Sequence, residues 1–144
     1  MRVYLDNCCY NRPFDDQSQL KVHLETVAKL AVQTLMRDGS IEYAWSEVLD
    51  GEIGDSPFPD RQEKILPWRD GAVIRAAITP EIEARAERLM HLGVKATDAL
   101  HLACAESVRC DWFMTVDRGI LSKVDHLGSM RVANPLSYVL EEMQ

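Results

Sequence analysis

The chain has 144 residues, of which 47% are hydrophobic and 27% charged, a composition typical of one globular domain rather than a disordered or fibrous protein. Its 16 Lys and Arg residues against 23 Asp and Glu residues give a net charge of −7 with His neutral. This balance excludes a basic surface over the whole protein, so a nucleic acid must be held by a local basic patch or through a metal ion. No apolar run reaches the roughly 18 residues of a membrane span, and Asp6 interrupts the apolar stretch that a signal peptide needs. We therefore expect a soluble, cytoplasmic protein with no membrane partner.

The predicted elements alternate between short β-rich runs and longer helical runs. The first half of the chain begins with a strand over 2–5, a helix over 16–37, a strand over 41–45 and a short helix over 47–52 with Ser46 as its N-cap. An irregular stretch over 54–59, a polar helix that ends before Pro67 and a strand over 73–78 come next. The second half has helices over 79–92 and 97–108, a strand over 112–116, a short helix after Asp117, a strand over 130–133 and a C-terminal helix after Asn134. Such alternation is typical of a parallel sheet covered by helices on both faces. We predict one domain over 1–144, with an α/β fold in three α/β/α layers around a mostly parallel sheet of about five strands.

Apolar residues recur at spacings of three and four along the longest predicted helix, and this periodicity predicts that they share one face, packed on the core. They are Leu20, Leu24, Val27, Leu30, Ala31 and Leu35. The helix over 97–108 has a comparable stripe, formed by Ala99, Leu100, Ala103 and Cys104. The four cysteines form no C-x-x-C pair and no zinc spacing, so we expect small buried thiols in a reducing compartment.

Four acidic residues occur where functional groups gather in a parallel sheet, just beyond the carboxyl ends of the strands. Asp6 follows the first strand, Glu47 follows the second by one turn, and Asp117 follows the fourth, while Asp98 opens the helix that leads into the fourth strand. Each alone has a structural explanation, as a strand end, a turn former or a first-turn acid of a helix. Together, with apolar flanks and few cations nearby, they form the kind of carboxylate cluster that binds Mg²⁺ or Mn²⁺.

Residues beside these acids are candidates for supporting roles. Asn7 and Thr115 flank two of the acids and are candidates to orient them by hydrogen bonds. Arg12, Lys95 and Arg118 lie near the predicted cleft and are candidates to bind substrate phosphates, although a solvated surface position is an equally good explanation for each.

Two further side chains carry open interpretations. His101 follows Asp98 by three residues and shares its helix face, but because hard-metal sites favour oxygen ligands we expect a buried, hydrogen-bonded histidine rather than a ligand. Trp68, beside Pro67, is a candidate to stack on a base or to pack on a partner protein.

The order of these segments resembles the PIN-domain family of metal-dependent ribonucleases, which includes the VapC-like toxins of bacterial toxin–antitoxin pairs. The segments are Leu-Asp6-Asn, Ser-Glu47, Lys95-Ala-Thr-Asp98-Ala-Leu-His-Leu-Ala and Thr115-Val-Asp117, and the resemblance covers essentially the whole chain. It implies that the four acids are catalytic, hold Mg²⁺ or Mn²⁺ and support cleavage of RNA phosphodiester bonds. An antitoxin protein and a second copy in a homodimer are the implied protein partners. One departure is Asn7, where toxins of this family usually carry Thr or Ser.

Other functions remain open. A haloacid-dehalogenase-like phosphatase needs a second Asp two residues after the first, where this chain has Cys8, and a receiver-like domain needs an acceptor Asp after the third strand, where Thr79 and Pro80 follow instead. The alternative from another class is a non-catalytic PIN-like module that binds RNA or protein. Such a module has no need for all four acids, and a response to Mg²⁺ or Mn²⁺ discriminates between it and the enzyme.

Overall fold

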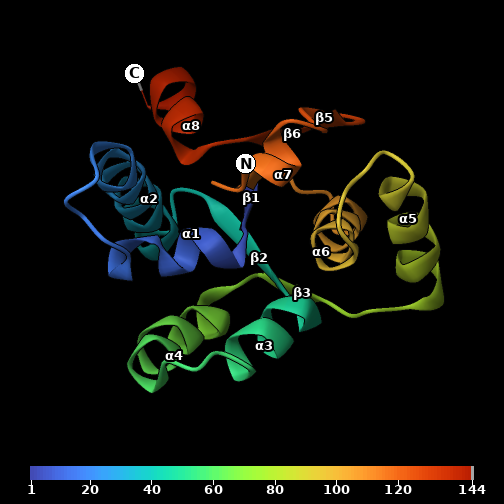
Figure 1. The fold of residues 1–144 in the computed structure, drawn as a ribbon, viewed down its shortest axis with the longest axis horizontal. Coiled ribbons are helices and arrows are strands. Elements are labelled where there is room, and N and C mark those ends of the chain that lie inside the picture. Colours follow the sequence, from blue (N-terminus) through green and yellow to red (C-terminus); the bar gives the residue numbers. More distant parts are fainter. Residues whose placement is uncertain (144) are drawn as a thin grey trace.

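Six strands form a single mixed sheet in the computed structural model, which describes residues 1–143 (Figure 1). The strands are β1 (Arg2–Leu5), β2 (Glu42–Ser46), β3 (Ile74–Ala76), β4 (Trp112–Met114), β5 (His126–Leu127) and β6 (Met130–Ala133), in the spatial order β3-β2-β1-β4-β6-β5. All neighbours pair in parallel except β5 and β6, which pair antiparallel. The α/β class is confirmed. The sheet is not wholly parallel, because a tight turn at Gly128 joins β5 directly to β6 and so makes the two strands antiparallel. β5 has only two residues, which is too short to give a periodic pattern in the sequence.

Helices connect the strands and lie on both sides of them. They are α1 (Asn7–Asn11), α2 (Leu20–Asp38), α3 (Glu47–Gly54), α4 (Pro59–Ile65), α5 (Pro80–Met90), α6 (Ala96–Ser107), α7 (Arg118–Leu121) and α8 (Pro135–Glu142), with short 3₁₀ helices η1 (Arg12–Phe14) and η2 (Leu66–Gly71). In Figure 1, α2 and α8 lie on one side of β1 and β2, and α5 and α6 lie on the other. None of the helices among residues 1–143 has both the length and the apolar composition to cross a membrane. Gln144, the last residue of the predicted domain, lies outside the described residues.

Three predicted helix starts are confirmed by their caps. The Ser46 hydroxyl accepts a hydrogen bond from the Leu49 N–H at 3.1 Å, and the Thr79 hydroxyl accepts one from Ile82 at 3.2 Å. The Asn134 side chain caps α8 in the same way. Caps act between neighbours in sequence, which is why the sequence predicts them well.

The predicted buried face of α2 is wrong. Leu20 is 71% exposed, and the neighbouring members of the predicted apolar face are exposed as well, namely Leu24, Val27 and Leu30. The face that is buried carries both apolar and polar side chains, namely Val22, Glu25, Thr26, Ala28, Lys29, Val32, Gln33 and Met36. Because α2 has apolar residues on two faces, its rotation is decided by the elements that pack on it, above all α8 and η1. The stripe predicted for α6, by contrast, faces the core, with Ala99, Ala103 and Cys104 buried.

The central strands direct their carboxyl ends toward one edge of the sheet. β1 pairs with β2 and β4, and the Asp6 backbone N–H continues the ladder by donating to the Met114 carbonyl at 2.9 Å. Tyr4 is fully buried and stacks on Phe113, with ring centroids 5.2 Å apart. This packing anchors the point where the chain leaves β1 and enters α1. The starts of α1, α3 and α7 therefore share the edge at which β1, β2 and β4 end.

The four cysteines are free thiols, and three of them, Cys9, Cys104 and Cys110, are buried. Burial raises the pKa of Cys104 to about 11 and that of Cys110 to about 12. These two thiols therefore stay protonated and behave as small apolar side chains, as predicted.

Candidate metal centre

Asp6 is held in one orientation by neutral donors. It is the first residue beyond β1 and is only 4% exposed. Its Oδ1 accepts from the Asn7 backbone N–H at 2.8 Å, and its Oδ2 accepts from the Thr115 hydroxyl at 2.9 Å and from the Cys8 thiol at 3.3 Å. These three donors are uncharged, so they fix the carboxylate without neutralising it. A buried carboxylate fixed by neutral donors is suited to receive a cation.

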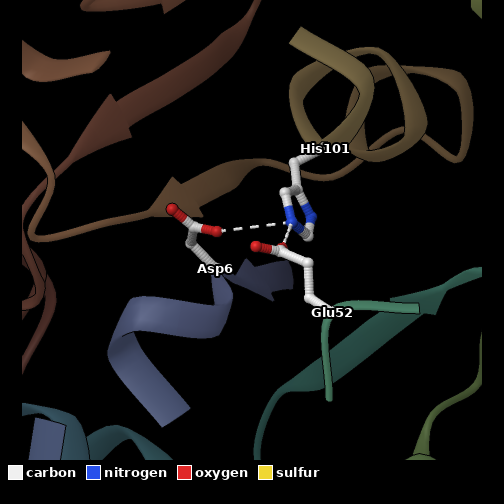
Figure 2. A group of neighbouring side chains, drawn as sticks. All are labelled: Asp6, Glu52 and His101. Atoms are coloured by element: carbon white, nitrogen blue, oxygen red, sulfur yellow. Dashed lines mark hydrogen bonds and ion pairs between the residues drawn. The ribbon is translucent and has the colours of Figure 1, made fainter. Parts of the chain in front are cut away.

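His101 and Glu52 lie against Asp6 (Figure 2). Nε2 of His101 hydrogen-bonds a carboxylate oxygen of Glu52 and lies 3.6 Å from Oδ1 of Asp6. One potential ligand atom from each of these three residues lies within 4.8 Å of the other two. On the other side of the ring, Nδ1 of His101 is 2.6 Å from the Tyr4 hydroxyl, which is itself 2.6 Å from the Ser46 hydroxyl. The imidazole is therefore fixed at both nitrogens.

The charges around His101 compete with its burial. Burial alone would lower the pKa of His101, but the hydrogen bond to Glu52 and the negative charges of Asp6, Glu52 and Asp98 raise it above its ordinary value. The carboxylates around His101 therefore favour its protonated form, which would compensate part of their negative charge. It is buried and hydrogen-bonded, as the sequence predicted, but it also points into the carboxylates rather than away from them.

Asp98 is sensitive to three other carboxylates. It is the third residue of α6 and is half-buried. Burial raises the pKa of Asp98 to about 6, and the negative charges of Asp6, Asp117 and Glu52 add to the rise, while His101 opposes it. Asp6, Glu52, Asp98 and Asp117, which we call the acid group, therefore face a common region. Burial is the largest cause of the rise, and the repulsion between Asp98 and its acidic neighbours adds to it.

Asp117 is connected to Asp6 through Thr115. The Thr115 hydroxyl donates to Asp6 and accepts a hydrogen bond from the Asp117 backbone N–H at 3.1 Å. Oδ1 of Asp117 accepts from the Gly119 N–H at 2.7 Å, which caps α7. Thr115 therefore contacts both acids between which the sequence placed it.

Of the four acids predicted from the sequence, Asp6 lies in the compact group with Glu52 and His101, and Asp98 and Asp117 are near enough for their charges to interact. Glu47, the first residue of α3, is exposed and lies outside the compact group, although its charge acts on Cys104 of α6. Glu52, which is on the same helix as Glu47, lies in the group. Five residues separate the two, so their side chains point about 140° apart around the helix axis.

A signal for Glu52 was present in the sequence. Val48, Leu49 and Ile53 form the buried face of α3, and Glu52 follows the first two by four and three residues. Glu52 therefore lies beside the apolar stripe of α3, which is the position that a carboxylate needs in order to point toward the protein interior. The contacts of Cys8 with Asp6 and of Tyr4 with His101 were also not predicted. The first is local to the start of α1, whereas the second joins β1 to α6 across 97 residues.

Two predicted supporting residues have other partners. The Asn7 side chain accepts a hydrogen bond from the Asn11 side chain at 2.9 Å, and only its backbone N–H contacts Asp6. Arg12 forms ion pairs with Asp15 at 3.0 Å and with Glu25 at 3.2 Å. Its charge is therefore already compensated within the protein.

Lys95 and Arg118 remain available as cations. Both are exposed, Lys95 directly before α6 and Arg118 at the first position of α7, next to Asp98 and Asp117 in sequence. Across residues 1–143, neither forms an ion pair with a carboxylate. Their places in the chain, three residues before Asp98 and one after Asp117, keep both as candidates to contact phosphates.

The donor set fits a divalent cation. Mg²⁺ takes carboxylate oxygens and keeps several waters, and Mn²⁺ accepts an imidazole nitrogen in addition. One carboxylate oxygen each of Asp6 and Glu52 lies with a His101 nitrogen in a group compact enough to hold an ion, and Asp98 and Asp117 are near enough for their charges to interact. This geometry is the observation that makes the fit, and a divalent cation would relieve the repulsion that adds to the burial of Asp98.

Comparison with protein-family models and with curated proteins finds no match for this chain. The class of protein therefore follows from fold and site alone. It is an α/β protein with a carboxylate-rich candidate metal site beyond the carboxyl ends of its parallel strands.

Proposed function

We propose that this protein is a Mg²⁺- or Mn²⁺-dependent endoribonuclease of the PIN type, with Asp6, Glu52, Asp98 and Asp117 as its metal-binding and catalytic acids. The observation that supports the proposal is the raised pKa of Asp98, to which burial contributes most and the other three acids add. A purely structural group of acids carries matching cations, since unpaired buried carboxylates are costly. Here the described partners are neutral donors and one histidine.

The residues of the chain have separate tasks in this reaction. A bound divalent ion supplies a water of lowered pKa and neutralises charge on the scissile phosphate. Thr115 and Cys8 hold the Asp6 carboxylate in position, and His101 orients Glu52. Lys95 and Arg118 attract the phosphates of the strand on either side of the acids.

RNA with unpaired bases is the proposed substrate. A protein of net charge −7 with few free cations beside its acids cannot hold a duplex over many phosphates. Single-stranded segments need fewer contacts, because their bases are accessible as well. The three-layer PIN arrangement, a role as a toxin, an antitoxin partner and a homodimer belong to the same proposal, and follow from the family resemblance.

The test uses two glutamates of one helix as a matched pair. Protein treated with EDTA is melted with and without Mn²⁺ and assayed on a single-stranded RNA, for the native chain and for Glu52→Gln and Glu47→Gln. We expect Mn²⁺ to raise the melting temperature of the native chain by mass action. Glu52→Gln should abolish this shift and reduce cleavage by about 100-fold or more. Glu47→Gln should keep both.

Three outcomes contradict the proposal in different ways. Identical melting with and without Mn²⁺, and no cleavage, leaves a non-catalytic binding module. Loss of activity in Glu47→Gln but not in Glu52→Gln returns the fourth ligand to Glu47. Efficient cleavage of double-stranded DNA without cleavage of RNA shows that the substrate is wrong.

A further inference from the structure

A pocket of about 590 Å³ lies on the sheet away from the acid group. We call it the Trp68 pocket, and its relevant residues are Arg37 at the end of α2, Tyr43 of β2, Lys64 of α4, and Trp68 and Gly71 of η2. Tyr43 pairs in register with Val3, three residues before Asp6. Each residue of a strand advances about 3.3 Å, so three residues place Tyr43 about 10 Å from the level of Asp6 along the strand direction. The pocket therefore lies toward the amino ends of β2 and β3, away from the acids. It shares no residue with the acid group.

The aromatic wall of the pocket is rigid. The rings of Tyr43 and Trp68 meet edge to face, with centroids 6.1 Å apart, and the Tyr43 hydroxyl donates to the Trp68 carbonyl. A Cβ at position 71 would lie 2.3 Å from the Tyr43 hydroxyl oxygen, so only glycine leaves room for this ring. The wall is therefore formed before any ligand binds, which lowers the entropic cost of binding.

A planar group already stacks on this wall. The Arg37 guanidinium lies over the Trp68 ring, 5.0 Å from its centroid. Arg37 is exposed, and cation–π contacts at exposed sites are weak. A flat, uncharged ring can therefore replace the guanidinium on Trp68, which frees Arg37 to bind an anion attached to that ring.

The pocket is positively charged on an acidic protein. Arg37 and Lys64 both line it, and no carboxylate does. Among the ion pairs formed within residues 1–143, neither cation takes part in one. Asp70 is close enough to act on Tyr43, whose pKa is raised mainly by burial and then by this charge, but Asp70 does not line the pocket. The Lys64 ammonium lies 5.8 Å from the centroid of Phe14, which is outside the pocket, as Arg37 lies over Trp68. Both contacts involve exposed cations and are weak, so an anionic ligand can replace them.

We propose that the Trp68 pocket binds a nucleotide, with the base stacked on Trp68 and the phosphate between Arg37 and Lys64. An aromatic platform beside cations is the combination that recognises a base and its phosphate together. The volume lies within the range of small-molecule sites, about 300 to 1,000 Å³. The same chemistry is presented by a free nucleotide and by one unit of an RNA strand, and the experiment separates these sources.

The experiment measures binding by isothermal titration calorimetry with AMP, UMP, adenosine, inorganic phosphate and a short oligoribonucleotide, in EDTA to prevent cleavage. We expect AMP or UMP to bind about tenfold or more tightly than adenosine or phosphate alone, since stacking and charge contribute together. Arg37→Gln combined with Lys64→Gln, and separately Trp68→Leu, should each weaken binding about tenfold or more. The double variant changes only exposed side chains, so it tests the pocket even where Trp68→Leu fails to fold.

Arg131→Gln is the matched control. Arg131 also lies 5.0 Å from a tryptophan centroid, that of Trp112, but it is ion-paired with Glu141 and lies outside the pocket. This variant should bind nucleotides as the native chain does. Binding of the oligoribonucleotide alone, lost in the pocket variants, identifies an RNA strand as the source, and binding of AMP or UMP identifies free nucleotides. No binding of either at millimolar concentration, or binding that the pocket variants leave unchanged, overturns the proposal. These binding measurements do not depend on whether the acid group cleaves RNA, so they test the pocket separately from the proposed function.

Discussion

Two regions of this protein bury a carboxylate, and the groups that surround the carboxylate differ between them. Asp6 in the acid group accepts hydrogen bonds from neutral donors, lies 3.6 Å from a single histidine nitrogen, and acts on other carboxylates. Glu25, which is 0% exposed on α2, is surrounded by two cations and an amide, although its Oε1 accepts no hydrogen bond within residues 1–143. We call that second region the Glu25 cluster. Its members are Arg12 at 3.2 Å, Lys21 at 4.0 Å and the Asn134 side-chain amide.

The difference separates a structural from a functional buried charge. A buried ion pair contributes little net stability, but it leaves no charge for a ligand to neutralise. A buried group of like charges is a net cost to folding, and it persists only where something else is gained. Burial alone therefore does not identify a site, whereas the balance of charges around the buried group does. Both carboxylates lie among apolar residues in the sequence, so only their partners distinguish them.

The largest expected effect breaks the Glu25 cluster. Glu25→Gln should lower the free energy of unfolding by about 3 kcal/mol, because the Arg12 guanidinium loses its fully buried partner and keeps only the partly exposed Asp15. Urea unfolding at neutral pH measures the change. The Mn²⁺-induced shift of the remaining folded protein should stay as in the native chain. Loss of that shift in a folded Glu25→Gln protein would show that the two regions are not separate.

Lys29 sharpens the comparison, because it is a buried cation without a partner. It is 4% exposed, its ammonium lies 5.8 Å from the Tyr10 ring centroid, and it forms no ion pair with any carboxylate of residues 1–143. Burial lowers the pKa of Lys29 from 10.5 to about 8. Between these values the unfolded chain holds a proton that the folded chain releases, so stability should rise with pH across that range.

Lys29→Met removes this cost. We expect the free energy of unfolding at neutral pH to rise by about 2 kcal/mol, and the increase in stability between about pH 8 and pH 10.5 to disappear. Urea unfolding at several pH values measures both. Lys95→Met, at an exposed position, is the control and should change stability by less than about 0.5 kcal/mol. A destabilised Lys29→Met protein would mean that the ammonium has a stabilising partner.

The smallest effect concerns stability at Asp98. Its folded pKa of about 6 exceeds the ordinary 3.8, so folding takes up a proton between these values and stability in EDTA should fall as pH rises through them. Asp98→Asn should remove this dependence and, at neutral pH in EDTA, raise the melting temperature by roughly 3 °C. With Mn²⁺ the native chain should have the higher melting temperature of the two, because the metal ion stabilises the native chain and not the variant. A lower melting temperature in EDTA with cleavage intact would instead assign Asp98 to stabilising the first turn of α6.

Contacts between neighbours in sequence were predictable. The caps at Ser46, Thr79 and Asn134 depend on residues two or three positions away, so the local pattern specified where these helices begin. Asp6 follows β1 directly and Asp117 follows the end of β4 by three residues, and the parallel topology alone brings the ends of these strands to one edge. For the same reason the α/β class followed from the alternation of elements.

The rotation of helices about their axes was decided only in the tertiary structure. On α2, apolar residues occupy two faces, and the long-range contacts of Glu25 with Arg12 and Asn134 select the face that is buried. On α3, the packing of Val48, Leu49 and Ile53 turns Glu52 inward and leaves Glu47 in solvent. A spacing in sequence states which residues share a face, but the free energy that chooses between two faces comes from partners that are distant in the chain.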